Sequence, residues 1–242
     1  MALLPEVPAE RRLLDTRDVS QRRVPLYLYV LHTTGAGIVQ RALDAGYRPD
    51  DAEGIAHFAA RFYAGDNEVS THLLVDWAGH VWQICRLDVD AWHSGYSPAM
   101  KALYYSPRRT EWMEWSQPLN GSLVHQSAND YTFWRAAHPG LSNPTEMLSA
   151  EVRARHGSPN MGSISIDLVA TIGGRPWSAA QLGGLRQALT ACGRLTGVLP
   201  TLNNVRRHSD LDPVYRGSVL RSRQIVEFPW DPKDLDLGAV LS

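Results

Sequence analysis

The chain has 242 residues, of which 44% are hydrophobic and 20% charged, values typical of a soluble globular protein with one large or two small domains. Its formal net charge of −1 provides no strongly basic or acidic surface, so neither nucleic acid nor a membrane is expected as a partner. Two cysteines, Cys85 and Cys192, are too few for a disulfide framework, and we expect both to be buried apolar residues.

The first 23 residues are charged and contain two prolines, which predicts an N-terminal arm with a short helix near Glu10–Asp15. They lack the uninterrupted apolar stretch of a signal peptide, and no segment of the chain is long and apolar enough to span a membrane. We therefore expect a protein that is cytoplasmic as synthesised and reaches a cell wall only by a route other than a signal peptide.

The next segment predicts a buried strand followed by a helix. Residues 26–31 are continuously apolar, which is typical of a strand covered on both faces, and His32 comes at its C-terminal end. Ligands of open α/β sheets gather at that end of the strands. A capping box at Asp50 and Glu53 then predicts a helix that ends at Gly65.

A hairpin is predicted where residues 70–76 alternate, a turn follows at Ala78-Gly79, and residues 81–85 return as an apolar strand. The chain leaves this hairpin through Ala91-Trp92-His93-Ser94-Gly95, which places an aromatic ring, an imidazole and a glycine together. Such exits from a rigid sheet often carry functional residues.

Residues 96–158, rich in Ser, Pro, Tyr and Trp, are predicted to be an insertion rather than a separate domain. A strand is predicted at 163–169, where a carboxylate at Asp167 would be costly unless it is paired or functional. A capping box at Ser178 and Gln181 opens a further helix, which is expected to end at a glycine before the loop that carries His208.

This mixture of strands and covering helices predicts an α/β or α+β fold, with a mixed central β-sheet flanked by helices. We assign a single domain to residues 24–232, with the insertion at 96–158 inside it, an arm at 1–23 and a C-terminal tail at 233–242.

Three of the polar residues, His32, Asp167 and His208, each lie in or just after a different predicted strand. Imidazoles and carboxylates are the usual ligands of a catalytic zinc ion that keeps one position open for water. Their types fit such a site, although residues so far apart in sequence do not establish one by themselves.

The order of local motifs is more specific than any single motif. Along the chain they are Leu31–Thr34, Val69–His72, Asp76–Gly79, Ala91–Gly95, Ser163–Val169, Gln181–Leu185, His208–Leu211 and Phe228–Trp230. This series resembles the zinc-dependent N-acetylmuramoyl-L-alanine amidases of the type 2 family, which also includes the peptidoglycan recognition proteins. The resemblance covers most of residues 26–95 and 160–230.

The resemblance implies a mixed sheet flanked by helices and hydrolysis of the amide between N-acetylmuramic acid and L-alanine in peptidoglycan or a muropeptide. It implies that His32 and His208 bind the Zn²⁺ cofactor. Asp167 matches the position where many members have a catalytic glutamate in a Ser-Ile-Gly-Ile-Glu strand.

The third zinc ligand departs from the family pattern, in which an Asp or Cys follows the second histidine in a tail such as Lys-x-Asp-Pro-Gly. Alternative alignments place Ser218 or Arg223 at that position, and neither is a normal zinc ligand. Asp212, on the same loop as His208, is the preferred candidate, and Glu227 is the second.

Other roles follow from the same alignment. Arg216, or alternatively Arg221, would replace the family's lysine as a fixed positive charge beside the developing oxyanion. Trp92, His93 and Thr33 are candidates for substrate binding, although a packing role is an open alternative for Trp92 and His93.

Two classes of function remain after this comparison. The retained His32, Asp167 and His208 favour an active, endolysin-like or recycling amidase, because a decayed site has no physical need for them. The missing Asp-Pro-Gly favours a metal-free peptidoglycan-binding module or a virion or assembly component of the same fold. Metal content distinguishes the two classes.

Overall fold

The computed structural model describes residues 3–14, 19–22, 25–65, 69–93, 115–119, 122–126, 160–170, 176–208, 218–221, 224–227, 232 and 235–242. Contacts divide the chain into two compact units. The first comprises Met1–His93, Asn160–Arg207 and Pro232–Ser242, and the second comprises Ser94–Pro159 and His208–Asp231.

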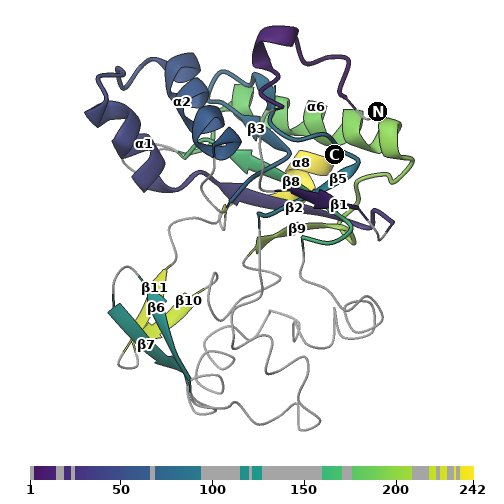
Figure 1. Cartoon of the computed structure of the whole chain (residues 1–242). Coiled ribbons are helices and arrows are strands. Elements are labelled where there is room, and N and C mark those ends of the chain that lie inside the picture. The colour runs from purple at the N-terminus through teal and green to yellow at the C-terminus, as the bar shows by residue number, and fades with distance from the viewer. Residues whose placement is uncertain are drawn as a thin grey trace, which may run out of the picture. The chain divides into compact units, whose positions relative to one another are not determined.

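A five-stranded mixed sheet with the order β4-β3-β8-β2-β9 forms the centre of the first unit (Figure 1). Its strands are β2 (Leu28–Thr33), β3 (Leu73–Val75), β4 (Val81–Gln83), β8 (Ser163–Leu168) and β9 (Val205–Arg207). The pairs β2–β8, β2–β9 and β3–β8 are parallel, whereas β3–β4 is the predicted antiparallel hairpin. The predicted mixed sheet and its buried apolar strand, β2, are thereby confirmed.

Helices cover both faces of this sheet, as predicted (Figure 1). On one face, α6 (Ala179–Thr196) and the short α8 (Leu237–Leu241) pack against alternate residues of β2 and β8. On the other, α1 (Gly35–Asp44) and α2 (Ala52–Ala64) pack over β3 and the segment that follows β4. Each helix buries one apolar side, which is the usual way in which an amphipathic helix is stabilised.

Strand β8 is apolar on one face and polar on the other. Ile164, Ile166 and Leu168 belong to the core under α6. Since side chains alternate along a strand, Ser163, Ser165 and Asp167 point to the opposite face, where all three are buried. A buried polar row in the centre of a sheet requires partners, and these partners form the candidate site.

The helix termini partly match the predicted caps. Helix α2 begins one residue later than predicted, because Asp51 rather than Asp50 accepts the hydrogen bond from the Gly54 N–H at 2.8 Å. Asp50 is instead engaged by the guanidinium of Arg48. Helix α2 ends at Gly65 as predicted.

In α6, Ser178 caps the Gln181 N–H as predicted, at 3.0 Å. The Gln181 side chain does not return to the cap, contrary to the predicted box. It is buried and donates to the carbonyls of Val75 and Val169, so it ties the helix to the sheet. A left-handed Gly197, with φ 75°, ends the helix.

The N-terminal segment is packed against the sheet and helices of the first unit, to which it belongs. Leu4 and Val7 lie in the core under α6, and β1 (Val19–Gln21) pairs antiparallel with β5 (Val89–Ala91). In place of the predicted helix near residues 10–15, Ala9–Arg11 form a single 3₁₀ turn, η1.

The described part of the second unit comprises His208 and two hairpins, β6–β7 (Trp115–Leu119 and Ser122–Gln126) and β10–β11 (Ser218–Arg221 and Gln224–Glu227). The rest of the predicted insertion lies outside the described residues. Among the residues that are described, no helix has the length and apolar character needed to cross a membrane.

Candidate active site

His32 and Asp167 lie side by side near the C-terminal ends of the adjacent strands β2 and β8. The parallel register of β2 and β8 pairs His32 with Asp167, and both side chains are buried. Paired residues of adjacent strands project to the same face, which here is the face covered by α2. Tyr63 of α2 confirms this direction, because its hydroxyl donates to Asp167 Oδ1 at 3.0 Å.

Burial gives Asp167 an unusual basicity. Removal from water raises the pKa of this carboxyl to about 6, and the hydroxyls of Thr71 and Tyr63 offset part of the shift. A carboxylate with a pKa near 6 is ionised at neutral pH and still accepts a proton readily. These are the properties that a general base requires.

His93, from the segment that follows β5, lies against His32. Its Nδ1 is 3.1 Å from His32 Nε2, and its Nε2 is 2.8 Å from Ser163 Oγ. The two rings meet edge to face, with centroids 5.2 Å apart. Burial, together with the neighbouring His32 and His72, lowers the pKa of His93 well below its usual value, so the ring is neutral at pH 7.

His72 has a structural role in this cluster. The Ser165 N–H donates to His72 Nδ1 at 3.0 Å, so Nδ1 accepts and Nε2 carries the proton. That proton is directed at the Val89 carbonyl, 3.0 Å away. Burial lowers the pKa of His72 to about 3, and the ring therefore stays neutral and ties three segments together.

His208 is buried and comes directly after β9. Arg207, the residue before it, pairs with Leu31, the residue before His32, in parallel register. The predicted ligand Asp212 and the predicted catalytic cation Arg216 lie outside the described residues. Within the part of the chain that is described, no cluster of three or more His, Cys, Asp or Glu side chains could hold a metal ion.

The three predicted substrate-binding residues occupy different environments. Trp92 is 44% exposed, and its backbone is fixed by hydrogen bonds to Ser70 at 3.1 Å and 2.9 Å. His93 lies beside His32, as described above. Thr33 is buried, and alternation along β2 places it on the face opposite His32. Their roles in substrate binding stay predictions.

Several residues of this cluster were missing from the sequence prediction. In the sequence, Tyr63 is indistinguishable from the apolar residues of an amphipathic helix. Arg22 lies within residues 1–23, which were predicted to be an N-terminal arm. The signal for Ser163 and Ser165 was available, because they alternate with isoleucines and end at Asp167, which marks one face of the strand as polar.

Comparison with known proteins places these residues in a family. A search of curated proteins found no match. Two solved structures are similar over most of their length. One is a crystal structure of a selenomethionine derivative of AmpD (17% identity, covering 84% of this chain and 83% of that one, TM-score 0.41). The other is the Ph2119 endolysin from Thermus scotoductus MAT2119 bacteriophage Ph2119 (13% identity, 92% and 86% covered, TM-score 0.40).

The family assignment rests on a sequence-family model, not on these distant structural likenesses. The model for N-acetylmuramoyl-L-alanine amidases matches residues 22–219, which include His32, His93, Asp167 and His208. This match confirms the family and the enzyme class that the order of motifs predicted. The chain therefore belongs to the N-acetylmuramoyl-L-alanine amidase family of peptidoglycan amidases.

Proposed function

We propose that the protein is a zinc-dependent amidase that hydrolyses the bond between N-acetylmuramic acid and L-alanine, with His32 and His208 as zinc ligands and Asp167 as general base. The observation that carries the proposal is the register of β2 and β8, which sets His32 beside a buried carboxylate of raised pKa. A potential ligand and a potential base thus lie next to each other on one face of the sheet.

The donor set fits zinc in its chemistry. Neutral imidazoles are preferred zinc ligands, and His32 and His208 both lie within the residues that the family model matches. We propose Asp212 as the third ligand, because a carboxylate adds charge neutralisation that a serine provides only as a costly alkoxide. When bound, zinc acts as a Lewis acid on the scissile carbonyl and lowers the pKa of water.

Asp167 carries the proton in this proposal. Its Oδ1 accepts the Tyr63 hydroxyl, which holds the carboxylate in place while it takes a proton from the attacking water. The same carboxyl then delivers that proton to the leaving amine of L-alanine. Aspartate is one methylene shorter than the family's glutamate, so its carboxylate depends more on a hydrogen bond such as that from Tyr63 to keep its position. We assign Arg216 the stabilisation of the developing oxyanion.

Trp92 is proposed to contact the sugar or peptide, because its large apolar side chain is exposed directly before His93. Peptidoglycan is the substrate class that family membership implies. Intact wall and soluble muropeptide remain alternative forms of it, which parallel assays on purified sacculi and on a defined muropeptide separate.

The test follows release of the L-alanine peptide from a defined muropeptide by the full chain, before and after removal of metal with a chelator. We expect hydrolysis that is lost on chelation and restored by zinc. Binding of muropeptide with no hydrolysis under either condition would favour the metal-free binding module instead. Hydrolysis that survives complete metal removal would contradict zinc dependence.

The third ligand is tested by zinc titration of two matched variants. Asp212→Ala is expected to weaken zinc binding markedly, whereas Ser218→Ala is expected to bind zinc like the wild type. Equal, wild-type affinities in both would exclude Asp212, and Glu227 would become the next candidate.

A further inference from the structure

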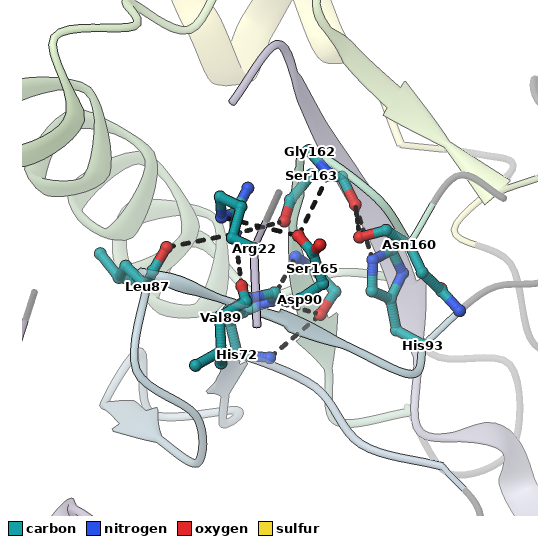
Figure 2. Close-up of polar contacts among 10 residues, drawn as sticks. All are labelled: Arg22, His72, Leu87, Val89, Asp90, His93, Asn160, Gly162, Ser163 and Ser165. Atoms are coloured by element: carbon teal, nitrogen blue, oxygen red, sulfur yellow. Dashed lines mark hydrogen bonds and ion pairs between the residues drawn. The ribbon is translucent and has the colours of Figure 1, made fainter. Parts of the chain in front are cut away.

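Arg22 is a buried cation that the N-terminal segment brings close to Ser163 and Asp90, near His72 and His93 (Figure 2). It follows β1, and its side chain is only 11% exposed. Its Nη2 donates to the carbonyls of Leu87, Val89 and Ser163 at 3.1, 2.6 and 2.9 Å. The guanidinium thus joins the N-terminal segment to two others, residues 87–89 and the start of β8.

Asp90 completes this arrangement. Its Oδ1 lies 3.6 Å from Arg22 Nε and accepts the Gly162 N–H at 3.1 Å. The ion pair thus holds both Gly162 and Ser163, the residues at which the chain enters β8. Burying two charges costs desolvation free energy that their attraction often fails to recover, so stability alone is a weak explanation for such a pair.

Ser163 connects this ion pair to the histidines. Its hydroxyl donates to the Asn160 carbonyl at 3.4 Å and therefore accepts from His93 Nε2 at 2.8 Å. His93 Nδ1 then lacks a proton and accepts from His32 Nε2 at 3.1 Å. With Nε2 protonated, the lone pair of a neutral His32 lies on Nδ1, the form in which an imidazole binds a metal through that atom.

We propose that Arg22 and Ser163 are positioning residues, which orient His93 and thereby hold His32 in the tautomer that presents Nδ1 to zinc. This inference rests on the proposed function for the identity of the metal. Hydrogen-bonded neighbours fix the ring orientation and tautomer of ligating histidines in general, and their loss weakens metal binding by about 10- to 100-fold. In this chain the fixing group originates in the N-terminal segment, outside the recognisable motifs.

The test combines two measurements on the full chain. Imidazole ¹⁵N signals of the metal-free protein report the tautomers of His32 and His93, and competition with a chelator reports zinc affinity. Ser163→Ala removes only the hydroxyl, whereas Ser163→Thr keeps one. Arg22→Gln removes the cation, Arg22→Lys keeps the charge, and Arg86→Gln is the matched control from an exposed ion pair with Asp88.

We expect Ser163→Ala and Arg22→Gln to mix the His32 tautomers and to weaken zinc binding about tenfold. Ser163→Thr and Arg22→Lys should recover much of this loss, and Arg86→Gln should change nothing. Wild-type ¹⁵N signals and zinc affinity in Ser163→Ala would overturn the proposal even if Arg22→Gln fails to fold. A wild type that binds no zinc but shows the expected tautomer shift would refute the proposed function and leave the hydrogen-bond chain standing.

Discussion

The two faces of the central sheet are built from the same strands and differ in almost every other respect. Under α6, Tyr29, Leu31, Ile164, Ile166 and Leu168 form a continuous apolar core. On the opposite face, His32, Ser163, Ser165 and Asp167 are equally buried but polar. Burial is therefore used for stability on one face and for chemistry on the other, where it raises the pKa of Asp167 and lowers that of His93.

The largest effect is expected from removing the carboxylate on the polar face. Asp167→Asn should reduce amide hydrolysis by about two to four orders of magnitude, because a positioned general base contributes roughly that much. Steady-state turnover of a muropeptide measures the loss, and zinc content should stay unchanged. Wild-type turnover in this variant would place the base elsewhere.

A substitution at Ile166, the residue before Asp167 on the apolar face, should change the stability of the protein and not its turnover. Ile166→Ala removes a fully buried side chain from the core under α6 and should lower the free energy of unfolding by about 2–5 kcal/mol. Chemical denaturation measures this change, and turnover per folded molecule should stay near the wild-type value. A large loss of turnover without loss of stability would mean that the two faces are not independent.

The buried carboxyl of Asp167 should make the stability of the protein depend on pH. Its folded-state pKa, about 6, lies above the ordinary value of 3.8, so the folded state favours the protonated carboxyl. The free energy of unfolding is therefore highest below pH 4 and falls as the pH rises through 6, by at most about 3 kcal/mol. Asp167→Asn, which cannot ionise, should therefore unfold at a higher temperature than the wild type at pH 8.

The same comparison near pH 4 serves as the internal control. There the wild-type carboxyl is protonated, and the advantage of Asp167→Asn should largely disappear. An advantage that is constant between pH 4 and pH 8 would show that ionisation of Asp167 is not its cause.

The smallest effect concerns Tyr63, which reaches Asp167 from α2. Tyr63→Phe removes a hydrogen bond that stabilises the ionised carboxylate, so the pKa of Asp167 should rise further. The acid limb of the pH profile of kcat/KM should then move to higher pH by less than about one unit. Movement to lower pH would contradict the assignment of Asp167 as the base.

The sequence was sufficient for the apolar face and for most of the framework. A continuous apolar run predicts β2, alternation predicts β8, and Gly65 and Gly197 end the helices where expected. Helix α1 was not predicted: Thr34 at its N-cap makes no side-chain capping hydrogen bond, and its Oγ1 instead accepts from the Ala170 N–H. Its glycine-rich start also has low helix propensity.

The polar face could be predicted only in part. Motif order identified His32 and Asp167, but their register depends on a pairing between strands that lie far apart in the sequence. The contacts of His93 with Ser163, and of Arg22 with Asp90, have the same origin. Local patterns carry no information on such distant pairs, whereas they do encode which face of a strand is apolar.

Zinc content of the purified full chain and of His32→Ala, by elemental analysis, tests the central claim most directly. The account predicts about one zinc per chain in the wild type and almost none in His32→Ala, whose circular dichroism should remain that of the wild type because His32 lies at the end of its strand. Full zinc occupancy in His32→Ala, or a wild type that binds no zinc, would contradict it.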